Sequence, residues 1–174
     1  MRKRRVLRQG ASYHVTAHIN QGLIVFDKKI AKQIFLAVLK RAKEKYSFEI
    51  KTFCIMNNHI HLYLKPDDGV SLSQLMQWIL SVFAMAWNRR NHGKGHVWDG
   101  RFFSRIVDGK KGYLELHQYI DQNPVKAHLT GAATRWVYCG LWHHRHQIRG
   151  IVEEPDRELL RAFPQHKPLT ERYV

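Results

Sequence analysis

Residues 48–65, FEIKTFCIMNNHIHLYLK, contain two runs of alternating apolar side chains on either side of the turn MNN. Alternation with a period of two is typical of strands, because successive side chains of a strand point to opposite faces of the sheet. The stretch therefore predicts a β-hairpin. Its second strand divides into an apolar face of Ile60, Leu62 and Leu64 and a second face of His59, His61, Tyr63 and Lys65.

The segments around the hairpin predict further strands and helices in a regular order. The predicted elements are a strand at 11–19, a helix from an Asp27 N-cap to about Tyr46, the hairpin, a helix that begins at Ser71 or Ser73 and stops at Gly93, a strand at 102–107, and a helix at 111–122. This order is the split βαβ arrangement. We therefore expect an α+β fold, with a ferredoxin-like antiparallel sheet and helices packed on it.

The length of 174 residues suits one core. We expect the folded domain to occupy residues 1–130, and residues 131–174 to form a basic C-terminal extension, because Trp, His, Arg and Pro are mixed there without strong periodicity. His143, His144 and His146 are expected to lie in a solvated or phosphate-facing loop of this extension. A second metal site is the alternative for these three histidines.

The chain carries a large excess of positive charge. Lysine and arginine outnumber aspartate and glutamate by 29 to 14, which leaves a net charge of +15 with histidine neutral. A field of this strength attracts polyanions, so nucleic acid is the expected partner; an acidic protein partner or simple solubility are the alternatives. The basic N-terminal segment at residues 1–10 is the first candidate for phosphate contacts; a disordered segment that contacts nothing is the alternative. Its basic residues are Arg2, Lys3, Arg4, Arg5 and Arg8.

The sequence also predicts the compartment. No apolar run approaches the roughly 18 residues that a membrane span needs, and no apolar segment follows the basic start. Cys54 and Cys139 show no CxxC spacing, so neither a disulfide framework nor a zinc knuckle is indicated. We therefore expect a cytoplasmic protein that makes no membrane contact.

His59 and His61 lie two positions apart on one strand face, which is close enough for both imidazoles to ligate one cation. Spacing alone slightly favours a solvated sheet face, so a metal site needs a third ligand. Tyr119 and Asn123 offer a nucleophile and an amide oxygen, because their i, i+4 spacing places them on one helix face. A core tyrosine and an asparagine that ends the helix before Pro124 are the alternatives.

These residues resemble the HUH nucleases, in which a histidine, a hydrophobic residue and a second histidine on a strand meet a tyrosine on a helix. More narrowly, three blocks are similar, in this order, to the REP-associated tyrosine transposases: MNNHIHLYL at 56–64, GHVWDGRF at 95–102 and YIDQNPVKAHL at 119–129. Asn57 stands where this family usually has proline. Cys139 and Gly140 stand where it often has a pair of serines.

The resemblance implies the HUH nuclease fold and an enzyme, a metal-dependent single-strand DNA endonuclease and strand transferase that acts on hairpin-flanked repeat DNA. Tyr119 would be the nucleophile and would form a 5′-phosphotyrosine, while His59, His61 and Asn123 would bind Mg²⁺ or Mn²⁺. Tyr119 would act in its own subunit or, in a homodimer, across the interface. The basic residues expected to contact DNA then also include Arg101 and Arg105.

Two rival functions belong to other classes. A non-catalytic DNA-binding regulator derived from a transposase would keep the fold and the basic surface without cleavage. A hydrolytic metalloenzyme would use the two histidines to activate water, with Tyr119 as a core residue. A covalent adduct between Tyr119 and DNA distinguishes the transposase from both rivals.

Overall fold

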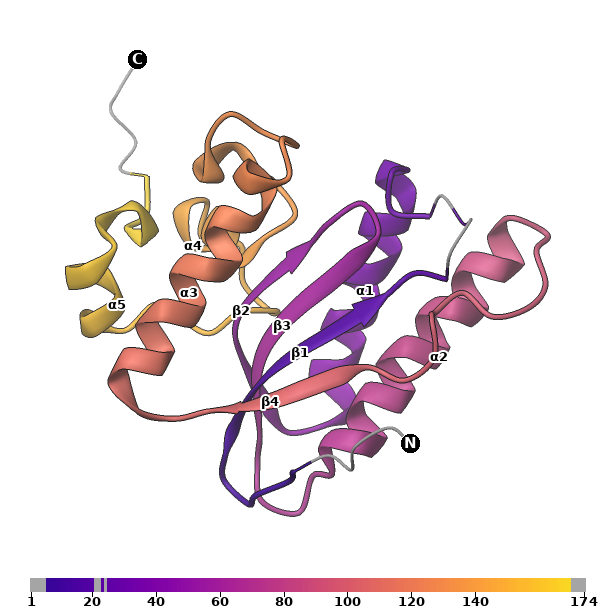
Figure 1. The fold of residues 1–174 in the computed structure, drawn as a ribbon, viewed down its shortest axis with the longest axis horizontal. Helices are drawn as coiled ribbons and strands as arrows, with labels where there is room; N and C mark the ends of the chain where they lie inside the picture. Colours follow the sequence, from indigo (N-terminus) through magenta and orange to yellow (C-terminus); the bar gives the residue numbers. More distant parts are fainter. Residues whose placement is uncertain (1–5, 21–22, 24, 170–174) are drawn as a thin grey trace.

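The computed structural model describes residues 6–20, 23 and 25–169, and within them the alternating segments form one sheet (Figure 1). Its strands are β1 (Ser12–His18), β2 (Phe48–Ile55), β3 (His59–Pro66) and β4 (Phe103–Val107). They lie in the order β2-β3-β1-β4, and each neighbouring pair is antiparallel. This arrangement confirms the α+β class and the ferredoxin-like antiparallel sheet.

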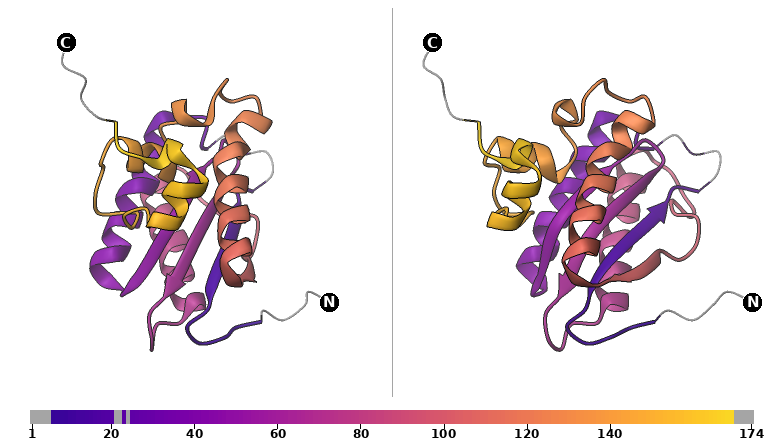
Figure 2. Two further views of the ribbon diagram at one scale, coloured as in Figure 1. Left: turned by 90° about the vertical axis from the view of Figure 1, so that its left-hand side faces the viewer. Right: turned by 60° about the vertical axis from the view of Figure 1, so that its left-hand side comes forward.

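The two faces of the sheet are covered by different helices (Figure 2). On one face, α1 (Lys29–Lys45) and α2 (Leu72–Arg90) bury the main apolar core. The apolar residues of β3 point into this core, and Ile60, Leu62 and Leu64 are fully buried there, as the alternation predicts. None of the described helices combines the length and apolar composition that a membrane span requires.

The opposite face of the sheet carries α3 (Gly109–Lys126) and the segments that follow it. Tyr63 of β3 and Cys54 of β2 pack there against Leu116 and Ile120 of α3, in a second and smaller apolar cluster. The same face of the sheet holds His61, which is buried, and His59, which is half-buried.

The C-terminal segment folds against the sheet rather than extending from it. It contains η1 (Ala133–Arg135), α4 (Gly140–Arg145), α5 (Arg157–Ala162) and η2 (Pro164–His166). Ile55 N–H donates to the Tyr138 carbonyl and Glu153 N–H donates to the Ile50 carbonyl, so this segment is hydrogen-bonded to β2. The division of the chain at residue 130 stays a prediction.

The expectation of a histidine loop in this segment is wrong. His143 and His144 lie in α4 and are buried, and His144 hydrogen-bonds to other parts of the chain. Only His146, which follows the helix, is exposed among these three. Burial follows because α4 packs with its histidine face toward β2 and η2.

Several predicted helix ends also differ from the structure. Lys28, not Asp27, is the residue before α1, and it makes no side-chain cap. Ser71 does cap α2, because its hydroxyl accepts a hydrogen bond from Gln74 N–H. The left-handed residue after α2 is His92, with φ 50°, rather than Gly93.

The third helix is longer than the sequence indicates. It begins at Gly109 and continues through Pro124 to Lys126, whereas the sequence predicts a helix at 111–122. Pro124 lies in the last turn, where its missing N–H removes a single helical hydrogen bond, and its ring is buried. Burial of the ring in the last turn offsets that loss, so the proline does not end the helix.

Gly140 marks the closest approach between α4 and β2. A Cβ at Gly140 would lie 2.4 Å from Thr52 Oγ1 and 3.1 Å from Thr52 Cα, and Thr52 is fully buried. We expect Gly140→Ala to lower the free energy of unfolding by about 2 kcal/mol or more, because a buried strand cannot move aside without strain. Urea denaturation measures this change. Gly131→Ala is the control, since its Cβ would meet no atom within 4 Å; equal stability of the two variants would contradict the contact.

Candidate active site

A row of histidines crosses two strands on the face that carries α3. The antiparallel register places His18 opposite His59 and Thr16 opposite His61, so His14, His18, His59 and His61 share this face. The Nε2 atoms of His59 and His61 are 3.0 Å apart, and His61 Nδ1 is 3.0 Å from His14 Nε2. The ring of His18 stacks on that of His59 at a centroid distance of 4.9 Å.

Burial keeps the imidazoles of His14, His59 and His61 neutral. It lowers the pKa of His59 to about 4 and that of His61 to about 3, and the neighbouring histidines add to both effects. Burial and then the charge of Arg105 lower the pKa of His14 to about 4. At neutral pH these rings therefore have lone pairs available, and neutral imidazole is the form that ligates a metal.

The distance between His59 and His61 fits a divalent cation. For a cation that binds nitrogen at about 2.1 Å, two ligands at a right angle lie about 3.0 Å apart, which is the separation of the two Nε2 atoms. The other nitrogen of each ring also has a partner, as metal-binding histidines usually do. His59 Nδ1 is 2.6 Å from Asn58 Oδ1, and His61 Nδ1 contacts His14.

The described residues offer no third His, Cys, Asp or Glu ligand beside the histidine pair. Among residues 6–20, 23 and 25–169, no group of three or more His, Cys, Asp or Glu side chains has the arrangement of a metal site. A third ligand from this part of the chain would be of another type, such as the amide oxygen of asparagine.

Tyr119 projects from α3 toward the same row of histidines. Its ring centroid is 5.6 Å from that of His61 and 5.8 Å from that of His14, in edge-on arrangements. The residue is 41% exposed, so it is not the core tyrosine of the alternative hypothesis. Lys126 Nζ lies 5.8 Å from the Tyr119 ring and adds positive charge beside it. The ring of Tyr119 and the histidine pair thus lie next to each other in one chain.

Asn123 lies one turn after Tyr119 on α3. Its Nδ2 donates to the Tyr119 carbonyl at 2.7 Å. In the portion of the chain that the structure describes, no hydrogen bond joins Asn123 to either imidazole. Its role as a metal ligand therefore stays a prediction.

The expected DNA contacts lie in different places. Arg2, Lys3, Arg4 and Arg5 fall outside the described residues. Arg8 forms an exposed ion pair with Asp108. Arg101 lines a cavity of about 840 Å³ between α2 and the loop at 95–102. Arg105 is at the site itself, because its Nε donates to His14 Nδ1 at 3.3 Å.

Sequence reasoning missed His14, His18 and Asn58 as neighbours of the histidine pair. The signal was present in ASYHVTAHINQ, where His14 and His18 are four positions apart and so share a strand face. Asn57, one of the two departures from the family pattern, also has a role. It accepts a hydrogen bond of 3.0 Å from Lys32 Nζ, and this bond ties the turn before His59 to α1.

Comparisons with known proteins point to transposases. The family model described as "Transposase IS200 like" matches residues 8–123. A candidate REP-associated tyrosine transposase of Haemophilus influenzae is 25% identical over 114 residues, which is 60% of this chain. The chain spans 65% of the length of that relative. A solved structure described as a REP-associated tyrosine transposase bound to a REP hairpin matches with a TM-score of 0.72, 22% identity and 88% coverage of both chains, which shows a shared fold.

Proposed function

Because the chain belongs to the IS200-like transposase family, we propose that it is a metal-dependent single-strand DNA endonuclease and strand transferase with Tyr119 as its nucleophile. The observation that carries the proposal is the distance of 5.6 Å between the rings of Tyr119 and His61, on the face that also holds His59. A nucleophile and a candidate cation site are thereby adjacent, as metal-assisted covalent cleavage of a phosphodiester requires.

The proposed substrate is single-stranded DNA that forms a hairpin beside a repeat. The net charge of +15 supports a polyanionic substrate. The solved relative with the same fold is described as bound to a REP hairpin, and we extend that class of partner to this chain. Arg105 and Lys126 supply positive charge near Tyr119, where a phosphate would lie.

In the proposed reaction the Tyr119 hydroxyl oxygen attacks phosphorus. The bond from phosphorus to the 3′-oxygen breaks, the phenolic proton is lost, and the leaving oxygen takes up a proton as a free 3′-hydroxyl. The product is a 5′-phosphotyrosine. A second 3′-hydroxyl can then attack this linkage, releasing Tyr119 and joining two strands without ATP.

His59 and His61 would hold Mg²⁺ or Mn²⁺, with Asn123 as a third ligand. When bound, the cation would neutralise phosphate charge. His14 and Asn58 would orient the two imidazoles through their second nitrogens. The tyrosine and the histidines come from one chain, so the proposal is cleavage in cis, and a homodimer is not needed to complete the site.

Covalent capture tests this proposal. The purified chain is incubated with Mn²⁺ and a pool of hairpin oligonucleotides that carry a 3′ label and randomised unpaired flanks, and is then run on a denaturing gel. We expect a labelled protein band, and we expect Tyr119→Phe to reduce it by at least about 10³-fold, because no other group replaces the nucleophile. Tyr113→Phe is the matched control, since Tyr113 is on the same helix but packs against Tyr63 and His117.

Two results would favour the rival functions. Tight binding of the hairpins with no adduct in any variant would indicate a regulator. Strand cleavage that survives in Tyr119→Phe would indicate a hydrolase in which water is the nucleophile.

A further inference from the structure

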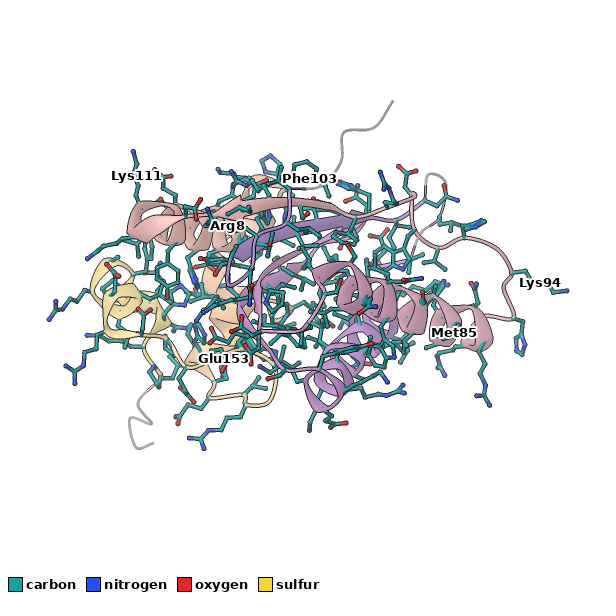
Figure 3. All side chains as sticks on the ribbon, turned by 90° about the horizontal axis from the view of Figure 1, so that it is seen from below. Arg8, Met85, Lys94, Phe103, Lys111 and Glu153 are labelled. Atoms are coloured by element: carbon teal, nitrogen blue, oxygen red, sulfur yellow. The ribbon has the colours of Figure 1, made fainter. Side chains whose placement is uncertain are left out.

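Phe103, the first residue of β4, differs from the other phenylalanines of the described chain. It is 62% exposed, while the other phenylalanines of the described residues are buried or half-buried. Figure 3 shows it along the same edge of the molecule as Lys111 of α3, on the side away from Met85 of α2. Its aromatic surface therefore faces solvent on the side of the sheet that carries the candidate active site.

The register of the sheet relates Phe103 to the histidine pair. Phe103 is opposite Thr16, and Thr16 is opposite His61, so these three side chains form one row across β4, β1 and β3. Neighbouring strands are about 4.8 Å apart, which places Phe103 about 10 Å from His61 along the sheet surface. A base attached next to a phosphate at Tyr119, or one nucleotide further, can reach that position.

Positive charge lies beside this aromatic ring. Arg105 is two residues along β4 on the same face, is exposed, and is directed toward the site by its bond to His14. An exposed aromatic ring next to an arginine is the combination that binds single-stranded nucleic acid, because the ring stacks on a base and the arginine contacts the backbone. We propose that Phe103 is a stacking platform for an unpaired base beside the scissile phosphate. The stacking role of Phe103 depends on the proposed function in one respect, which is that DNA binds to this face of the sheet.

Fluorescence of 2-aminopurine tests the proposal. A short oligothymidylate with 2-aminopurine at one position, moved along the strand in a series, is titrated with the Tyr119→Phe chain, which keeps the DNA intact. We expect quenching of the fluorescence on binding, because a stacked base loses emission. Adding Phe103→Ala should remove the quenching and weaken binding about 5- to 100-fold, whereas Phe103→Trp should retain both.

Met85→Ala is the matched control, since Met85 is 63% exposed but lies on α2. It should change neither quenching nor affinity. If Phe103→Ala binds and quenches as the parent does, the proposal is overturned. It is also overturned if Phe103→Ala converts a dimer to a monomer in sedimentation, because the exposed ring on the edge strand would then be a contact between copies.

A second measurement needs no variant at Phe103. Photocrosslinking of the unsubstituted chain to an oligothymidylate that contains 5-iododeoxyuridine should label the peptide with Phe103, and labelling elsewhere alone would contradict the stacking role. Loss of the covalent adduct with quenching intact would count against the proposed cleavage and still support the platform. Normal adduct formation without quenching would support the proposed cleavage and count against the stacking platform.

Discussion

Replacing His61 with alanine is expected to abolish Mn²⁺ binding and to slow adduct formation by about 10³-fold or more. His61 lies at the centre of the site, where its Nε2 is 3.0 Å from His59 and its Nδ1 is 3.0 Å from His14. The substitution removes one of the three proposed protein ligands, and without the cation a phosphate facing Tyr119 would lose most of its charge neutralisation. Electron paramagnetic resonance of Mn²⁺ measures the binding, and the rate of the labelled band measures the reaction.

Two comparison variants separate ligand loss from general damage. His14→Ala keeps all three proposed ligands but removes the partner of His61 Nδ1, so we expect Mn²⁺ affinity to fall about 10- to 100-fold. His96→Ala removes an exposed imidazole from the loop before β4 and should have no effect. Unchanged Mn²⁺ binding in His61→Ala would mean that the histidine pair is not the metal site. Lost binding with a normal adduct would mean that cleavage does not need the metal.

The sheet and its faces could be predicted because burial acts on each strand separately. Ile60, Leu62 and Leu64 need an apolar partner layer, and the alternation alone assigns them to one face and His59 and His61 to the other. The element order then leaves few ways to connect four strands with short links. Local patterns were therefore sufficient for the fold class.

The rest of the site depends on relations between segments. His14 meets His61 only because β1 pairs with β3 in one register, and a shift by one residue would turn His14 away. The side chain of Asn123 bonds to the helix backbone, which periodicity cannot indicate. Pro124 suggests a helix end, but its burial in the last turn overrides that tendency. These features follow from tertiary packing, which a single sequence does not encode locally.

A buried polar network lies between α3 and the C-terminal segment, where the sequence predicts a solvated histidine loop. Asp121 is 2% exposed, and its Oδ2 is 2.7 Å from Nε2 of the fully buried His166. His166 Nδ1 is 2.8 Å from His144 Nδ1, and His144 Nε2 reaches the Glu153 carbonyl at 3.0 Å. This network joins the helix that carries Tyr119 to α4 and η2. The C-terminal segment therefore helps to hold Tyr119 in place.

Replacing His166 with alanine is expected to lower the free energy of unfolding by about 3 to 5 kcal/mol. Asp121 Oδ1 has no hydrogen-bond partner among the described residues, so loss of His166 leaves a buried carboxyl with neither oxygen bonded. Burial already raises the pKa of Asp121, and the bond to His166 opposes that rise. Urea denaturation of His166→Ala, Asp121→Ala and the double variant completes a double-mutant cycle. We expect the double variant to be more stable than the sum of the single effects predicts, by about 1 to 3 kcal/mol. Additive effects would mean that the two side chains stabilise the fold independently, and that the network does not anchor α3.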